Sequence, residues 1–189
     1  MHPALHSFLH GKITLSAEHE ALVARIFQVK SARRNEILVP KGAVAKHLYL
    51  VAKGCLRVFL LDDHGRESTR FMVFEGRMGT AFPSFIRQQP SAAAVQSLEA
   101  SELLTLSYAA RQVLCREVPG WETLERHALE REYIAAIERI EGFLTLPATA
   151  RYEALRQQSP ALVQRLPAKI IADYLGISPE TLSRLKARG

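Results

Sequence analysis

The chain has 189 residues, of which 48% are apolar and 23% charged, the usual profile of a soluble globular protein with one or two domains. No apolar stretch approaches the roughly 18 residues that a membrane-spanning helix needs, and the first residues lack the pattern of a secretory signal. The two cysteines, Cys55 and Cys115, exclude a disulfide framework and a four-cysteine metal site, so a reducing cytoplasm is the expected location.

The net charge of +6 comes from 25 Lys and Arg against 19 Asp and Glu, and most of the excess lies in the last part of the chain. Residues 146–189 carry seven bases and three acids. A basic segment of this kind favours a polyanionic partner, most often nucleic acid. The alternative is an ordinary solvated helical surface with a modest excess of arginine.

Residues 1 to about 35 are predicted to be helical, because Leu22, Ile26 and Val29 recur at helical spacing after a serine cap at Ser16. Short strand-like runs then follow, separated by turns that contain glycine. One of these turns, Asp63-His64-Gly65, lies between two apolar runs and predicts a hairpin. Many short strands at close spacing favour a small sandwich or jelly-roll barrel. The runs are residues 36–39, 48–51, 55–61, 70–74 and 102–106.

The helical period returns after residue 107, with a short helix over 108–118 and a long helix over about 121–146. The long helix would span roughly 39 Å, which is more than a barrel of this size can cover. Its apolar stripe is therefore expected to pack against a second copy of the chain, although it could instead lie along its own barrel. The predicted dimerisation residues are Leu129, Tyr133, Ile137, Ile140 and Leu144.

Residues 166–185 have the pattern of a helix-turn-helix motif. The first predicted helix, 168–175, places the small Ala172 where a second helix must approach closely. Gly176 supplies the left-handed backbone of a tight turn, and Ser178 is the expected N-cap of the second helix, with Pro179 in its first turn. Ile177 is expected to fill the gap between the two helices.

The second helix of this motif turns a polar face outward, because Leu182 and Leu185 are expected to point inward. An ordinary helical hairpin is the alternative, but it does not require a small residue, a glycine turn, a cap and a polar face together. The predicted DNA-binding residues are Lys169, Ser178, Glu180, Thr181, Ser183, Arg184 and Arg188, with Lys186 also placed on this face.

The sequence resembles the CRP/FNR superfamily of bacterial transcription regulators, and is most similar to its short members of Bacteroidetes type. The resemblance covers residues 10–188, and its most specific parts are the helix-turn-helix motif and the strand and turn Leu48-Tyr49-Leu50-Val51-Ala52-Lys53-Gly54. It implies an α+β fold in which a cyclic-nucleotide-binding-like jelly-roll barrel (1–118), a dimerisation helix (119–146) and a helix-turn-helix domain (147–189) follow one another.

The resemblance also implies partners and base-reading residues. A homodimer would bind double-stranded DNA, with RNA polymerase as a further candidate partner. Glu180 would accept a hydrogen bond from cytosine N4, and Arg184 would donate to guanine O6 and N7. A third reading position, an arginine in the cyclic-AMP receptor, is Pro179 here, so the operator need not be the same.

At the effector site the sequence departs from the pattern of the cyclic-AMP-binding members. These carry a Gly-Glu-Leu element that holds the ribose and an Arg-Ser pair that holds the phosphate, where this chain has Gly79-Thr80-Ala81 and Pro90-Ser91-Ala92-Ala93. Arg87 is close, but a few residues early. A phosphate without an arginine would lose a strong charge-assisted hydrogen bond, so neither cyclic AMP nor cyclic GMP is expected to bind or to be required.

The predicted effector pocket, Gly79, Thr80, Ala81, Ser91 and Ala92, is built from small and neutral residues. Such a lining suits an uncharged or apolar effector that the sequence does not identify. Alternatively the space is filled from within, and the barrel serves only as a dimerisation scaffold. The side chains expected to be close enough to fill it are Phe71, Val73, Phe82 and Phe85.

Neither a metal site nor a catalytic site is predicted. His47, His64 and His127 lack the paired spacing of metal ligands, and Ser84, Ser91 and Ser101 have no evident base nearby. The sequence therefore indicates a dimeric DNA-binding transcription regulator without a cofactor and without enzymatic activity. The alternative is a small-molecule-binding or catalytic barrel whose C-terminal helices only pack or contact protein partners.

Overall fold

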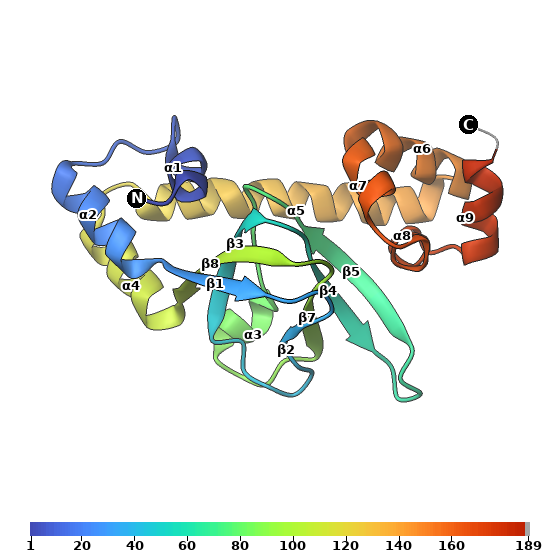
Figure 1. Cartoon of the computed structure of the whole chain (residues 1–189), viewed down its shortest axis with the longest axis horizontal. Helices are drawn as coiled ribbons and strands as arrows, with labels where there is room; N and C mark the ends of the chain where they lie inside the picture. Colours follow the sequence, from blue (N-terminus) through green and yellow to red (C-terminus); the bar gives the residue numbers. More distant parts are fainter. Residues whose placement is uncertain (188–189) are drawn as a thin grey trace. The chain divides into compact units, whose positions relative to one another are not determined.

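The computed structural model describes residues 1–187, except for the side chains of residues 161 and 162, and divides into two compact units. The first unit comprises residues 1–126, and the second begins at His127. One helix, α5 (Trp121–Thr145), runs from the first unit into the second (Figure 1).

The first unit is built around two four-stranded antiparallel sheets (Figure 1). The strand order is β1-β8-β3-β6 in one sheet and β2-β7-β4-β5 in the other. Strands adjacent in a sheet are often distant in the chain, which is typical of a jelly-roll barrel and confirms the predicted fold class. The strands are β1 (Gln28–Ala32), β2 (Ile37–Val39), β3 (His47–Lys53), β4 (Leu56–Leu61), β5 (Glu67–Val73), β6 (Met78–Gly79), β7 (Ala93–Ser97) and β8 (Ser101–Ser107).

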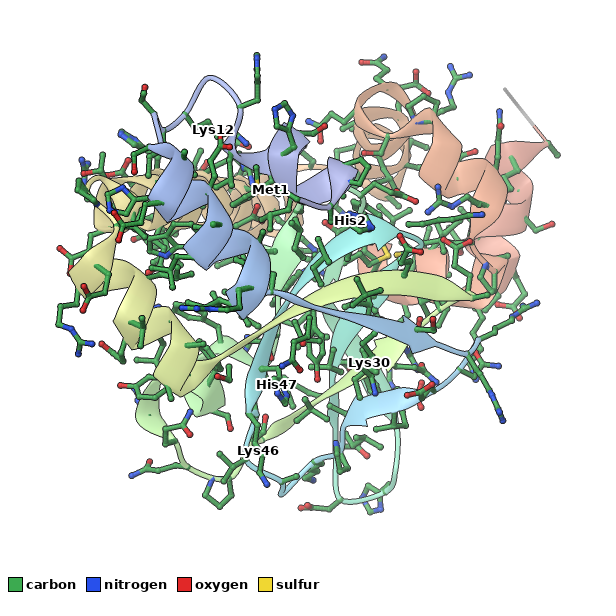
Figure 2. All side chains as sticks on the ribbon, turned by 60° about the vertical axis from the view of Figure 1, so that its left-hand side comes forward. Met1, His2, Lys12, Lys30, Lys46 and His47 are labelled. Atoms are coloured by element: carbon green, nitrogen blue, oxygen red, sulfur yellow. The ribbon has the colours of Figure 1, made fainter. Side chains whose placement is uncertain are left out.

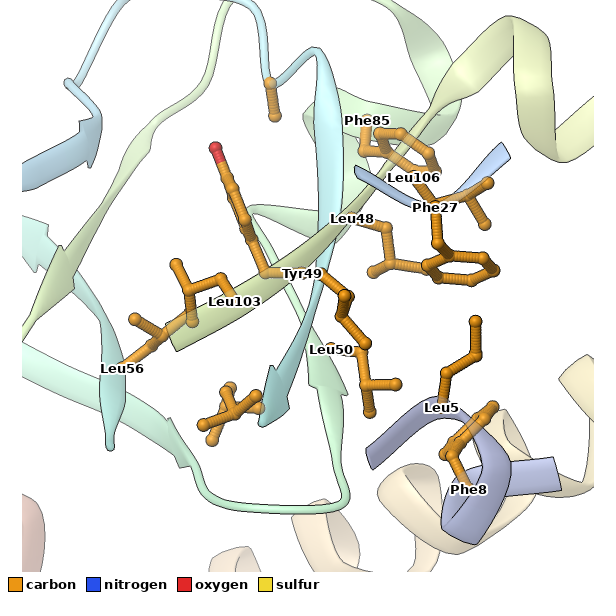
Figure 3. Packing of buried hydrophobic residues seen from close by; sticks show 14 of the residues in the cluster. Leu5, Phe8, Phe27, Leu48, Tyr49, Leu50, Leu56, Phe85, Leu103 and Leu106 are labelled. Carbon is orange, nitrogen blue, oxygen red and sulfur yellow. The ribbon is translucent and has the colours of Figure 1, made fainter. Parts of the chain in front are cut away.

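The hydrophobic core of the barrel lies between the sheets and extends to the N-terminal helix (Figure 3). Leu50 of β3 and Leu103 of β8 have no exposed surface, and Leu5 and Phe8 of the first helix pack against the same cluster. Burial of a leucine or phenylalanine side chain stabilises a fold by roughly 1.5–3 kcal/mol, so this cluster is the main source of barrel stability. Four short helices belong to this unit: α1 (Pro3–Leu9), α2 (Ala17–Ile26), α3 (Phe82–Arg87) and α4 (Tyr108–Glu117).

The predicted hairpin is confirmed, because β4 and β5 pair antiparallel across the turn. Asp62 Oδ1 accepts hydrogen bonds from the backbone N–H groups of His64 (2.9 Å) and Arg66 (2.8 Å). Gly65 takes the left-handed backbone, with φ at 74°, that closes the turn.

The helical prediction for the N-terminal region is wrong beyond residue 26, where strand β1 begins after a single residue. Val29, taken for part of a helical apolar face, lies in this strand and is 60% exposed. It pairs with Leu104 of β8, so the conformation of β1 is fixed by a partner far along the chain. Strands β6 and β7 are absent from the sequence prediction.

Up to residue 187, the second unit consists of the later turns of α5 and four further helices, two of which, α6 and α7, the sequence analysis did not identify. Its buried centre includes Leu155 of α6, Ile171 of α8 and Leu182 of α9. Within residues 1–187, no helix combines the length and apolar character that crossing a bilayer requires. The helices are α6 (Ala148–Gln158), α7 (Pro160–Arg165), α8 (Ala168–Leu175) and α9 (Pro179–Lys186).

Candidate nucleic-acid interface and effector cavity

The turn between α8 and α9 has the geometry that the sequence predicts. Gly176 is left-handed (φ 64°), and its N–H donates to the Asp173 carbonyl at 3.1 Å. The N–H of Ile177 donates to the Ala172 carbonyl at 3.0 Å, which closes the end of α8. A Cβ at Gly176 would lie 2.8 Å from Phe143 Cε1, so a side chain there would require the Phe143 ring to shift.

Helix α9 begins at the predicted serine cap. Ser178 Oγ accepts a hydrogen bond from the N–H of Thr181 at 3.1 Å, and Pro179 occupies the first turn. Ser178 and the N–H of Glu180 itself hydrogen-bond the Glu180 carboxyl and lower its pKa below the usual value. Glu180 is therefore an anion at neutral pH, at the positive end of the helix.

The side chains of α9 sort into a buried and an exposed face. Leu182 has no exposed surface, whereas Glu180, Ser183 and Arg184 are exposed. Thr181 is half-buried. Its Oγ1 accepts a hydrogen bond from Arg184 Nη2 at 3.3 Å and lies 3.1 Å from Ser178 Oγ. The hydroxyl of Thr181 thus links the cap to the guanidinium of Arg184.

The remaining predicted DNA-binding residues lie on other parts of the motif. Lys169 is exposed in the first turn of α8. Lys186 is exposed in the last turn of α9, with Nζ 3.5 Å from the Val163 carbonyl oxygen. Arg188 lies outside the described residues. Helix α9 therefore brings together Ser178, Glu180, Thr181, Ser183 and Arg184.

The predicted dimerisation residues are all exposed on the single chain. Their exposed fractions range from 36% for Ile137 to 80% for Leu144. The structure adds Ile134, 56% exposed, which sequence spacing did not select. A row of exposed apolar side chains along one helix is unusual for a surface in contact with water alone. The five predicted members are Leu129, Tyr133, Ile137, Ile140 and Leu144.

A cavity of about 150 Å³ lies at the predicted effector site, between α3, β5 and the start of β7. Three of the predicted residues, Ala81, Ser91 and Ala92, line it, whereas Gly79 and Thr80 do not. Gly79 serves packing instead, because a Cβ there would lie 2.3 Å from Val73 Cγ2. The complete lining is Arg70, Ala81, Pro83, Ser84, Arg87, Gln89, Pro90, Ser91, Ala92 and Ala93.

The expectation of a neutral lining is wrong, because Arg70 and Arg87 both form part of the wall. Burial lowers the pKa of the Arg70 guanidinium, which also lies 5.4 Å from the centre of the Phe71 ring. Sequence reasoning missed Arg70 because it lies on β5, outside the two short segments that were compared with the family pattern. Val73 and Phe85, expected as space-filling groups, belong to the hydrophobic core instead.

Besides the arginines of the cavity, the barrel carries a cluster of two lysines and a histidine (Figure 2). These residues are Lys30 of β1, Lys46 directly before β3, and His47 of β3. Burial and the two lysine charges lower the pKa of His47 below its usual value. Lys30 Nζ also lies 3.4 Å from Glu36, so part of this positive charge is compensated. Among residues 1–187, no group of three or more His, Cys, Asp or Glu side chains is arranged to hold a metal ion.

Residues 29–117 match the family of cyclic nucleotide-binding domains. Among curated protein sequences, none matches the chain significantly.

Solved structures of bacterial regulators share the fold over most of the chain. The cyclic-di-GMP-responsive global regulator CLP of Xanthomonas campestris has a TM-score of 0.73 and 16% identity, over 92% of this chain and 91% of that one. The catabolite activator protein of Thermus thermophilus has a TM-score of 0.58 and 24% identity, over 96% and 85% of the two chains. A putative CRP/FNR-family regulator of Eubacterium rectale has a TM-score of 0.69 and 16% identity, over 92% and 83%. Residues 29–117 are therefore similar to the cyclic nucleotide-binding domain family, and the chain shares the fold of these solved regulators, one of them of CRP/FNR type.

Proposed function

We propose that this protein is a dimeric, sequence-specific DNA-binding transcription regulator. The observation that carries the proposal is the capped helix α9, which follows a glycine turn and exposes Glu180, Ser183 and Arg184. A helix with this polar face fits the major groove of B-DNA. The functional segments remain those given by the sequence: a barrel at 1–118, a dimerisation helix at 119–146 and a DNA-binding domain at 147–189.

Base reading is assigned to Glu180 and Arg184, which stand one helical turn apart on the exposed face of α9. Arginine donates two hydrogen bonds to guanine, and a carboxylate accepts from cytosine N4. The hydrogen bond from Arg184 to Thr181 favours one orientation of the guanidinium before DNA binds. Thr181 and Ser178 therefore support base reading by Arg184, whereas Lys169 and Lys186 supply charge for phosphate contacts.

Dimerisation is assigned to the exposed apolar row of α5. A two-fold dimer supplies two copies of α9, and helix-turn-helix dimers bind half-sites about one DNA turn, roughly 34 Å, apart. Charge supports binding to DNA, because residues 146–189 hold most of the excess of bases. RNA polymerase is a further proposed partner.

The proposed regulator depends on neither cyclic AMP nor cyclic GMP. Its cavity of about 150 Å³ is smaller than the roughly 300–1,000 Å³ of most small-molecule pockets. No acidic residue lines it, so nothing in the wall would accept hydrogen bonds from a ribose as a carboxylate does. The alternatives of an unidentified effector and of a barrel that serves only as a scaffold both stay open.

The test begins with selection of a duplex from a random pool, followed by gel-shift titration of the selected site. Arg184→Ala should weaken specific binding by about 1–3 kcal/mol, roughly 5- to 150-fold, and relax the preference at one base pair. Arg156→Ala is the matched control, because Arg156 is an exposed arginine that pairs with Glu153 of its own helix.

Two results would contradict the proposal. Unchanged affinity and base preference in Arg184→Ala would remove α9 as the reading helix. Failure of the wild-type protein to select any duplex, together with weak and salt-insensitive retention on heparin, would favour a barrel protein whose C-terminal helices only pack.

A further inference from the structure

Three side chains join α5 to the turn of the helix-turn-helix motif within the second unit. They are Arg139 and Phe143 of α5 and Arg151 of α6, here called the arginine clamp. Arg139 Nη2 donates a hydrogen bond to the Tyr174 carbonyl at 2.8 Å. Its guanidinium lies 4.3 Å from the centre of the Tyr174 ring and 4.7 Å from that of Phe143. Arg139 therefore lies between two aromatic rings while it binds the end of α8.

Arg151 binds the ends of two helices at once. Its Nε donates to the Leu175 carbonyl at 3.2 Å, and its Nη1 donates to the Leu146 carbonyl at 2.7 Å. Leu175 is the last residue of α8, and Leu146 directly follows α5. The guanidinium also lies 5.2 Å from the centre of the Phe143 ring, so the same ring contacts both arginines.

These contacts follow from elementary helix chemistry. The last carbonyls of a helix have no partner within it and carry the negative end of the helix dipole. A guanidinium satisfies them by charge-assisted hydrogen bonds, which are stronger than neutral ones. Its planar fork and its stacking on aromatic rings fix its orientation, which a lysine would not do. Phe143 fits closely against the turn, because a Cβ at position 176 would lie 2.8 Å from its ring.

The connection that the clamp spans is very short. Helix α5 ends at Thr145 and α6 begins at Ala148, which leaves only Leu146 and Pro147 between them. A two-residue link has few backbone dihedrals, but rotation about any one of them would swing the whole motif. Without contacts across the link, the direction of α9 relative to α5 would vary.

We propose that Arg139 and Arg151 are positioning residues for DNA binding: they lock the helix-turn-helix motif to the dimerisation helix and thereby set the spacing and rotation of the two reading helices. This inference rests on the proposed function. Neither residue needs to touch DNA, because each acts through the carbonyl groups of α8 and the Phe143 ring. The lock predicts a strict dependence of affinity on the distance between half-sites, since a rigid dimer tolerates only one distance.

The test compares Arg139→Gln and Arg151→Gln, which each remove one positive charge, and Arg139→Lys, which keeps it. Two control variants also remove one positive charge each. Arg131→Gln is the control on α5, where Arg131 contacts its neighbour Glu132, and Arg156→Gln is the control on α6. The first readout is hydrogen exchange of the full-length protein without DNA. The clamp variants should exchange roughly tenfold faster at the amides of Leu146, Gly176 and Ile177, whereas the amides of α9 keep their protection.

The second readout is affinity for the selected palindrome and for versions with one to five base pairs added between the half-sites. Wild type and controls should discriminate at least roughly tenfold against altered spacing, and the clamp variants should lose most of this discrimination while remaining dimers. Base preference within one half-site should stay unchanged, because α9 itself is intact.

Several outcomes would overturn the proposal. Two of them are unchanged hydrogen exchange and retained discrimination between half-site spacings in the clamp variants. A third is loss of amide protection throughout α9, because this would show that the arginines only keep the motif folded. Wild-type behaviour of Arg139→Lys would show that charge alone suffices and would remove the role of the planar fork. A wild-type protein that selects no DNA would refute the proposed function, and the positioning role with it, while exchange would still decide whether the arginines fix the turn.

Discussion

Replacement of Gly176 by alanine is a sharp test of how the turn of the motif is built. The residue has a left-handed backbone, with φ at 64°, and a Cβ there would lie 2.8 Å from Phe143 Cε1 and 3.6 Å from two further ring atoms. Two costs therefore add. A left-handed backbone costs a residue with a side chain roughly 1–2 kcal/mol, and displacement of the ring from its rotamer costs about 0.5–1.5 kcal/mol more.

We expect Gly176→Ala to reduce the free energy of opening of the motif by about 1.5–3.5 kcal/mol, which corresponds to roughly 10- to 400-fold faster exchange of its most protected amides. Hydrogen exchange is the suitable assay, because the single tryptophan, Trp121, belongs to the first unit and its fluorescence would report on the barrel. The peptide that covers α8 and α9 gives the local value directly.

The chain supplies a matched control for the backbone cost. Gly42 is also left-handed, with φ at 86°, but a Cβ there would meet no atom within 4 Å. Gly42→Ala should therefore cost its own unit only about 1–2 kcal/mol. In a double-mutant cycle, Phe143→Leu should relieve the excess cost in Gly176→Ala, because the smaller side chain removes the close contact. Equal costs for the two glycine substitutions, with no coupling to Phe143, would refute the close contact between the ring and the turn.

Three further predictions concern other parts of the chain. Ile137→Glu combined with Ile140→Glu should convert a dimer to monomers in sedimentation at micromolar concentration, because charges would replace exposed apolar groups of α5; a wild-type monomer would contradict the proposed interface. Calorimetric titration with millimolar cyclic AMP or cyclic GMP should give no binding heat; micromolar affinity for either would contradict this and make Arg70 and Arg87 the candidate phosphate ligands. Burial and the charges of Lys30 and Lys46 lower the pKa of His47 in the folded protein, so the imidazole binds a proton more readily in the unfolded chain. The barrel should therefore lose stability as the pH falls from about 7 to 5. His47→Gln should reduce that loss in urea unfolding followed by Trp121 fluorescence, and an unchanged pH dependence would exclude His47 as its source.

The helix-turn-helix motif could be predicted from sequence because its determinants are local. The glycine turn, the serine cap and the buried Leu182 all lie within one short segment, and each acts on its near neighbours. The long helix was predictable for the same reason. Strand β1 could not be predicted in this way, because its conformation depends on pairing with β8. Val29 pairs with Leu104, about 75 residues later in the chain. Strand β7 was missed because its small residues, Ala93 and Ala94, give no alternating apolar pattern.

The candidate sites also differ in whether their determinants are local in the sequence. The exposed face of α9 could be predicted, since one helical period assigns all its members. The arginines of the cavity could not, because Arg70 and Arg87 are brought together by the pairing of strands and the position of α3. The clamp was equally hidden, since Arg139 and Tyr174 are 35 residues apart and meet only in the folded second unit.

Helix α5 is the one element that the two units share, and it is held differently along its length. At its start, Glu125 accepts a hydrogen bond from Arg111 Nη2 of α4 at 2.6 Å, which fixes the helix to α4, and another from Trp121 Nε1 of its own helix at 3.1 Å. Near its end, Arg139 fixes it to α8 by the hydrogen bond to Tyr174. Between Arg126 and Glu138 no side chain is buried, and the apolar row is exposed. Arg111 and Arg139 thus hold α5 to neighbouring helices near its start and near its end, each within its own unit. The exposed apolar row, from Leu129 to Leu144, is the surface of α5 on which we propose that a second copy packs.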